Sequence, residues 1–173
     1  MLARETIKIG VLFVARGQDN QRDILKNSKG SEAYEEFLKG LGDRVSLKHH
    51  LGFQAGLKYK ADGEEAIYSS DALTEIMYHV ATMMPEGEDD QVLNKKRHIG
   101  NDPVNIVWCE NYRLYRRNTI SSQFNFVQIV IYPMKFNLFR VMIQKKDGVC
   151  FSDIFVKKIA WVIIPMDKQY DSR

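Results

Sequence analysis

Hydrophobic positions in the first part of the chain follow the spacing of a strand and then of two helices. Residues 7–14 (IKIGVLFV) form an almost unbroken apolar run with several β-branched side chains, which is typical of a buried central strand. Asp19 or Asn20 can cap a short helix over residues 21–26. Ser31 begins a second helix, whose apolar side chains recur at helical spacing on one face: Tyr34, Phe37, Leu38 and Leu41.

Beyond this point the pattern indicates more strands than helices. A short strand is expected at residues 45–47, and glycines among polar residues predict a loop or hairpin over residues 48–66. Residues 76–81 contain β-branched and aromatic side chains with Pro85 close behind, which favours a strand. Further strands are predicted at residues 104–108, 124–132 and 139–144. We expect the last two to be antiparallel neighbours.

One helix is indicated by its charges rather than by its apolar spacing. Acidic residues between positions 86 and 90 precede residues 91–94, and the basic residues 95–97 follow them. Acid at the start and base at the end of a helix complement its macrodipole. Gly100 is a natural stop, and Pro103 prevents continuation because it has no N–H.

These elements predict an α/β fold in which residues 1–173 form a single domain, with a central mixed β-sheet flanked by helices.

The net charge of +3, from 25 basic and 22 acidic residues, is too small by itself to indicate nucleic acid or a membrane. Cys109 and Cys150 have no close spacing, which indicates reduced thiols in a cytosolic protein. No secretory signal and no apolar run of about 18 residues is present, so a cytoplasmic location is expected.

The motifs of several enzyme classes are missing from the sequence. It lacks the G-x-x-x-x-G-K-[ST] loop of nucleotide hydrolases and the G-x-S-x-G elbow of serine hydrolases. The histidines are not spaced i, i+4, so no metal site is predicted. His79 lies within an apolar run and is expected to be a hydrogen-bonded histidine of the core.

A basic turn, residues 95–102 (KKRHIGND), separates the charged helix from an apolar strand. On its residues alone this turn is ordinary: Gly100 can cap the helix, Asn101 tolerates a left-handed backbone, and Asp102 can form an Asx turn. A second basic cluster, interleaved with aromatic residues, follows the same strand: Tyr112, Arg113, Tyr115, Arg116 and Arg117. We expect the two clusters to flank one rim of the sheet, as solvated faces or as a surface for an acidic partner.

The segment KKRHIGNDPVNIVW, residues 95–108, resembles the signature of the Rap/Ran-GAP family, whose members activate GTP hydrolysis by Rap, Ral or Rheb. Similarity covers roughly residues 7–146 and includes IKIGVLFVARGQ, GSEAYEEFLKGLG, GFQAGL, YHVATMMP and SSQFNFVQIVIYPMK. The resemblance implies a G-domain-like α/β sheet, in agreement with the mixed sheet expected from the pattern.

The catalytic residue of this family is the asparagine of an H-[IL]-G-N-D motif, called the asparagine thumb, which corresponds to Asn101. Arg97, His98 and Asp102 are implied to orient the thumb or to touch the GTPase. Pro103 departs from the family, many of whose members carry another residue there. The resemblance implies that the chain supplies the thumb in trans and is not itself an enzyme. No cofactor of its own is expected, because the GTPase carries GTP and Mg²⁺.

The implied partner is a Ras-family small GTPase. A Ral-type GTPase comes first because IVW…YRR and IVIYPMK most resemble activators of Ral, and a Rheb-type GTPase comes next because QFNFV resembles an activator of Rheb. The residues expected to dock the GTPase are basic: Lys95, Lys96, Arg113, Arg116 and Arg117. A regulatory subunit or a homodimer is left open.

Two other functions remain open on the sequence. A scaffold could bind a GTPase without catalysis, although the intact Asn101 argues against it. A nucleic-acid-binding module could use residues 95–97 and 112–117, because basic residues interleaved with aromatics suit single strands. Both clusters are short and the RRM, KH and OB signatures are absent, so no nucleic-acid partner is expected.

Overall fold

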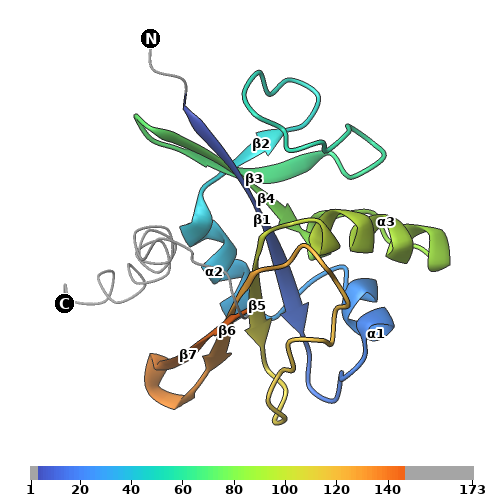
Figure 1. The fold of residues 1–173 in the computed structure, drawn as a ribbon, viewed down its shortest axis with the longest axis vertical. Helices are drawn as coiled ribbons and strands as arrows, with labels where there is room; N and C mark the ends of the chain where they lie inside the picture. The colour runs from blue at the N-terminus through green and yellow to red at the C-terminus, as the bar shows by residue number, and fades with distance from the viewer. Residues whose placement is uncertain (1–3, 147–173) are drawn as a thin grey trace.

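Seven strands form one mixed sheet in the order β2-β3-β4-β1-β5-β6-β7 (Figure 1). The computed structural model of the chain describes residues 4–146. The strands are β1 (Glu5–Val14), β2 (Asp43–Ser46), β3 (Glu65–Ser70), β4 (Thr74–Val80), β5 (Val104–Cys109), β6 (Val127–Pro133) and β7 (Phe139–Lys145). β4, β1, β5 and β6 run parallel, whereas β2, β3 and β7 pair antiparallel at the two sides. All four central strands therefore begin at one edge of the sheet and end at the opposite edge.

Two of the three α-helices begin where the sequence supplies a capping side chain. They are α1 (Gln21–Lys26), α2 (Glu32–Leu41) and α3 (Asp89–Gly100), with short 3₁₀ turns η1 (Ala81–Met83) and η2 (Lys135–Asn137). The side chain of Asn20 accepts a hydrogen bond from the backbone N–H of Asp23, and that of Ser31 accepts one from Tyr34. These caps satisfy N–H groups that have no partner within the helix.

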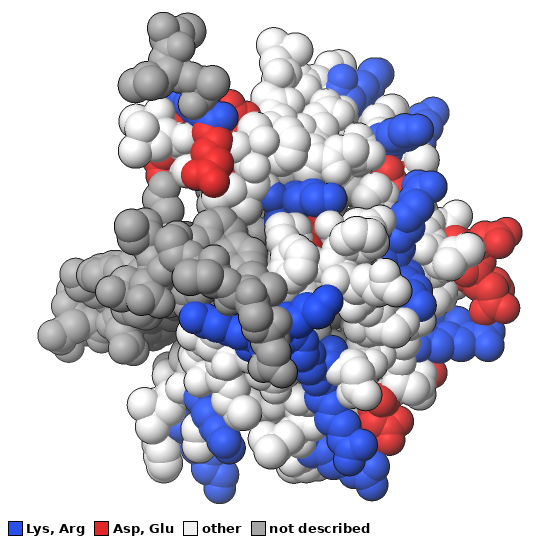
Figure 2. Space-filling view, viewed as in Figure 1, with Lys and Arg blue, Asp and Glu red and all other residues white. Residues whose placement is uncertain are grey.

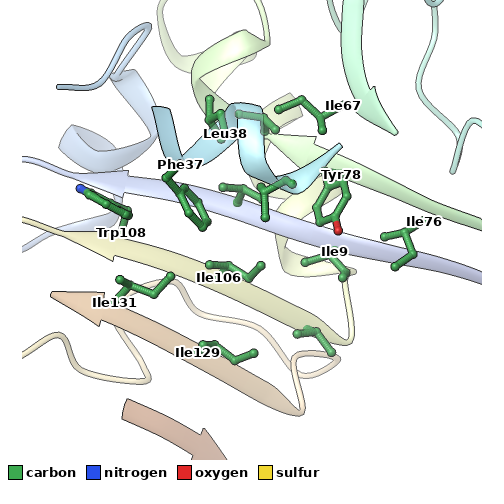
Figure 3. Close-up of a cluster of buried hydrophobic side chains, with 14 of the residues drawn as sticks. Ile9, Phe37, Leu38, Ile67, Ile76, Tyr78, Ile106, Trp108, Ile129 and Ile131 are labelled. Carbon is green, nitrogen blue, oxygen red and sulfur yellow. The ribbon is translucent and has the colours of Figure 1, made fainter. Parts of the chain in front are cut away.

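Two hydrophobic layers enclose the sheet. α2 covers one face, where Phe37 packs against Trp108 (Figure 3). α1 and α3 cover the opposite face, where Ile24 and Ile99 join a second cluster around Leu12. Figure 1 shows α2 on one side of the sheet and α1 and α3 on the other. Full burial of each such side chain contributes about 1.5–3 kcal/mol to stability.

Most of the predicted elements are confirmed, including the central β1, the helix caps, the end of α3 at Gly100 and the antiparallel pair β6–β7. β3 was not predicted, because residues 48–66 were expected to form a loop or hairpin and the run that follows is short and partly exposed. β6 begins at Val127 rather than at residue 124, where Phe124 is exposed. Within residues 4–146, none of the helices has the length and apolar character needed to cross a bilayer.

Candidate functional site

The turn between α3 and β5 places Asn101 on the surface, at the edge where the parallel strands begin. Asn101 caps α3 and is exposed, with its backbone N–H donating to the carbonyl of His98 at 3.0 Å. Its side-chain Nδ2 donates to the carbonyl of Arg97 at 2.8 Å. Its backbone does not use the left-handed conformation that asparagine tolerates, because φ is −97° and ψ is 1°. Many residue types adopt this conformation, so the backbone does not require asparagine here.

Asp102, the next residue, points in the opposite direction and is completely buried. Instead of forming the expected Asx turn, its carboxylate contacts Nδ1 of His79 on β4, at 2.8 Å to Oδ2 and 3.0 Å to Oδ1. Lys8 Nζ on β1 lies 3.9 Å from Oδ1. Burial raises the pKa of Asp102, and the hydrogen bond with His79 opposes that rise. Asp102 therefore anchors the turn to the sheet.

His98, in the last turn of α3, is held by a second carboxylate. Its Nε2 lies 2.9 Å from Oδ1 of Asp62, in the segment between β2 and β3. Asp62 also accepts hydrogen bonds from Asn94 Nδ2 at 2.7 Å and from the backbone N–H of Lys58 at 2.8 Å. Burial alone would raise the pKa of Asp62, but these hydrogen bonds and His98 lower it overall. Burial lowers the pKa of His98 despite the neighbouring carboxylate.

A glycine on β1 makes room beneath the turn. Gly10 pairs with His79 on one side and with Asn105 on the other, so the three positions form a row across the sheet. A Cβ atom at Gly10 would lie 2.2 Å from Asn105 Oδ1 and 3.1 Å from Asp102 Oδ2. No side chain fits at this position without moving the groups that support the turn.

Residues 121–126 complete the site from the other side. Ser122 Oγ donates to the carbonyl of Gly100, and Asn125 Nδ2 donates to the carbonyl of Asp102 at 3.2 Å. The carbonyl of Pro103 accepts hydrogen bonds from two successive backbone N–H groups of this segment, Phe126 and Val127. Pro103, which was expected to depart from the resembled family, is thus bonded through its carbonyl oxygen.

A groove of about 440 Å³ lies beside Asn101, between the last turns of α3 and residues 121–124. Its walls include the exposed side chains of Leu93 and Phe124 together with Lys96 and Arg97. Lys96 Nζ donates to Ser121 Oγ at 3.0 Å, and Arg97 Nη2 donates to Asn94 Oδ1 at 2.9 Å. The groove therefore combines apolar surface with two positive charges next to an exposed carboxamide.

The expectation that both basic clusters flank one rim is wrong. Arg113 contacts Asp19 at 3.3 Å just beyond the end of β1, and with Arg116 it lines a different pocket. That pocket lies at the edge where the parallel strands end, whereas Asn101 lies where they begin. β5, six residues long, separates the two ends by roughly 20 Å. Figure 2 shows basic side chains at the upper right, in the middle and in the lower part of the visible face rather than in one place.

Two of the expected docking residues have structural contacts instead. Lys95 is only 2% exposed and its Nζ donates to the carbonyl of Asn27 at 3.1 Å, so it cannot belong to a surface. Burial lowers its pKa. Arg117 is half-buried and its Nη2 donates to the carbonyls of Asn125 and Phe126. The basic residues that remain beside Asn101 are Lys96 and Arg97.

Within the described residues, no group of three or more histidine, cysteine, aspartate or glutamate side chains is arranged to hold a metal ion. The site offers hydrogen-bond donors and acceptors, positive charge and a small apolar wall. Such an arrangement can place a neutral polar group against a partner, but it does not form an enclosed pocket for a small substrate.

Comparison with known proteins identifies the family of this fold. Residues 24–162 match the family described as Rap/ran-GAP. The chain belongs to the Rap/ran-GAP family. It is 48% identical over 149 residues to human Ral GTPase-activating protein subunit alpha-1, an overlap of 86% of this chain and 7% of that protein. It is 46% identical to mouse Ral GTPase-activating protein subunit alpha-2, over 86% of this chain and 8% of that protein.

A solved structure of the TSC2 GAP domain shares this Rap/ran-GAP fold, with a TM-score of 0.81 and 38% sequence identity. The match covers 85% of this chain and 84% of the TSC2 chain. The chain therefore corresponds in extent to that isolated domain, while it spans 7–8% of the length of the Ral GTPase-activating subunits.

The sequence did not reveal the contacts of two residues beneath this turn. His79 was expected to be a buried, hydrogen-bonded histidine, and it is, but its bond to Asp102 directly under the turn that carries Asn101 was not foreseen. Asp62 gave no signal, because it lies in a glycine-containing loop 36 residues from His98. Hydrophobic patterning identifies which side chains are buried but not which distant groups they contact.

Proposed function

We propose that this chain stimulates GTP hydrolysis by a Ras-family small GTPase, by inserting Asn101 into the nucleotide site of that GTPase in trans. The observation that carries the proposal is an exposed carboxamide on a buried, hydrogen-bonded base, at a position whose backbone does not require asparagine. Membership of the Rap/ran-GAP family supports the same function. Because the GTPase is intracellular, a cytoplasmic location is part of the proposal.

An asparagine suits this role for electrostatic reasons. Phosphoryl transfer requires mainly positioning and charge stabilisation from the protein. A carboxamide has two donors and an acceptor without net charge, so its oxygen can hold the attacking water while an N–H faces a γ-phosphate oxygen. It adds no negative charge to a crowded anionic pocket. The GTPase supplies GTP and Mg²⁺, and the chain supplies no cofactor.

The substrate ranking within the proposal is a Ral-type GTPase first and a Rheb-type GTPase second. The first rests on 48% identity to a Ral GTPase-activating subunit, and the second on the resemblance of QFNFV to an activator of Rheb. The test is kcat/KM for stimulated GTP hydrolysis on purified Ral, Rheb and Rap at one salt concentration, because this ratio measures discrimination. A preference for Rheb or Rap would reverse the ranking, and no stimulation of any of them would refute the function.

The docking surface is assigned to Lys96 and Arg97 beside the thumb. The double variant Lys96→Ala/Arg97→Ala is expected to raise KM by about 5- to 30-fold with little change in kcat, because it removes binding shared by ground and transition states. The matched control is Arg113→Ala/Arg116→Ala, which removes the same charge at the opposite edge of the sheet and should leave KM within about twofold.

Salt provides a second readout of the same surface. The difference between the Lys96→Ala/Arg97→Ala variant and the unmodified chain should shrink as ionic strength rises, because exposed charges are screened. Equal KM values for the two double variants would assign docking elsewhere. The two basic clusters lie at opposite ends of the parallel strands. This separation disfavours a nucleic-acid-binding module, which needs both clusters on one continuous surface.

A further inference from the structure

The thumb residue lies between two side chains that distant parts of the chain hold in place. His98 precedes Asn101 by three residues and contacts Asp62 at 2.9 Å. Asp102 follows Asn101 directly and contacts His79 at 2.8 Å. The rings of His98 and His79 also touch, with centroids 5.0 Å apart at an interplanar angle of 61°. The two histidine–carboxylate pairs thus form one cluster directly under the turn that carries Asn101.

Each pair is itself anchored to a different element. His79 belongs to β4, a central strand that pairs with β1. Asp62 belongs to the segment before β3, where its second oxygen accepts the backbone N–H of Lys58. The turn is therefore connected to the sheet on one side and to the β2–β3 segment on the other. α3 alone does not determine the position of the turn.

The cluster beneath the turn is polar, whereas the neighbouring row of side chains on the same face of the sheet is apolar. On the same face of the sheet, the row one step further along the strands is apolar, with Leu12 opposite Val107 and Val107 opposite Val130. The row beneath the turn instead contains His79, with Gly10 and Asn105 beside it. Buried polar groups cost stability unless they are fully hydrogen-bonded. Nε2 of His79 is buried without a hydrogen-bond partner among the described residues, so the ring is held through Nδ1 and its contact with Asp102.

We propose that His79 and Asp62 are positioning residues that hold Asn101 in the orientation required for GTP hydrolysis, an inference that rests on the proposed function. His79 acts through Asp102, and Asp62 acts through His98. Holding a reacting group within a fraction of an ångström of its productive position is a large part of catalysis, and a misplacement of about 1 Å can reduce a rate about 100-fold. The two residues do not touch the GTPase, because both are buried.

A pair of substitutions at His79 separates positioning from packing. His79→Leu removes the donor to Asp102, whereas His79→Asn retains an N–H near the position of Nδ1. We expect His79→Leu to lower kcat about 10- to 100-fold with KM within about twofold, because Lys96 and Arg97 still dock the GTPase. His79→Asn should recover most of the loss. At the second pair, Asp62→Leu should lower kcat similarly, whereas Asp62→Asn keeps one acceptor oxygen for His98 and loses the one for Lys58, so its loss of kcat should be smaller.

A structural control uses Val130→Ala, which removes buried volume from the same face without touching the cluster. It should lower the melting temperature while leaving kcat unchanged below that temperature. If the losses of kcat among all variants simply follow their melting temperatures, the residues are only structural and the proposal is overturned. A rise in KM at constant kcat, or an equal loss in His79→Leu and His79→Asn, would also overturn it.

A readout without a GTPase keeps this proposal distinct from the proposed function. In the ¹⁵N-labelled chain, the side-chain amide resonances of Asn101 can be assigned by their absence in Asn101→Ala. His79→Leu and Asp62→Leu should shift or broaden them, and His79→Asn and Val130→Ala should not. Unchanged resonances in folded His79→Leu would refute positioning, whereas a chain that shows these shifts but stimulates no GTPase would refute the function alone.

Discussion

Asn101→Ala is expected to lower the stimulated rate of GTP hydrolysis by at least about 100- to 1,000-fold, the usual effect of removing one well-aimed transition-state donor. The effect should fall on kcat rather than KM, because Lys96 and Arg97 remain to dock the GTPase. Stability should change little: Asn101 is exposed, and the substitution removes one hydrogen bond, from Nδ2 to the carbonyl of Arg97. A bond of this kind contributes about 0.5–1.5 kcal/mol.

The measurement is single-turnover GTP hydrolysis at saturating chain, with thermal melting of each variant alongside. Asn101→Asp is the matched control, since it keeps the size of the side chain but replaces its N–H donors with negative charge. It should be at least as inactive as Asn101→Ala. Full activity in a folded Asn101→Ala chain would refute the thumb mechanism, even if GTPase binding persisted.

Trp108→Ala is expected to have the largest effect on stability, a loss of about 3–5 kcal/mol in the free energy of unfolding. Trp108 is completely buried in β5, with its ring 5.1 Å from Phe37 and 5.6 Å from Phe139. Its Nε1 donates to Glu110 Oε1 at 3.1 Å, and the same oxygen accepts a hydrogen bond from Ser31, the cap of α2. The substitution therefore opens a cavity and also weakens the start of α2.

Chemical denaturation, with the free energy extrapolated to zero denaturant, measures this loss. Trp108→Phe keeps most of the ring volume and should cost clearly less. Trp108 lies on the α2 face, opposite the face that supports Asn101, so kcat of the folded Trp108→Ala chain should remain near that of the unmodified chain. A selective loss of kcat at full stability would show that the α2 face is coupled to the thumb. The pair Asn101→Ala and Trp108→Ala therefore separates activity from stability.

The sequence by itself determined the features that depend on neighbouring residues. The apolar run of residues 7–14 defined β1, and Asn20 and Ser31 defined the starts of two helices through bonds to residues three positions away. Gly100 and Pro103 bracketed the end of α3. Capping and hydrophobic period act over one or two turns, so they can be read from the chain directly. Asn101 stood out through a motif resemblance, which is also a local pattern.

Only the tertiary structure decided which distant side chains meet. Lys95 and Lys96 are adjacent in sequence, yet one is buried against Asn27 and the other borders the groove, because a helix turns them to different sides. Arg113 lies at the opposite edge from Asn101 because β5 carries the chain across the sheet.

The contacts beneath Asn101 could likewise not be predicted from the sequence. Asp102 meets His79 across 23 residues and His98 meets Asp62 across 36, and these contacts arise from the order of strands in the sheet and the return of the β2–β3 segment. Of these four side chains, local pattern indicated burial only for His79. The partners are set by strand order and register, which involve interactions along the whole chain.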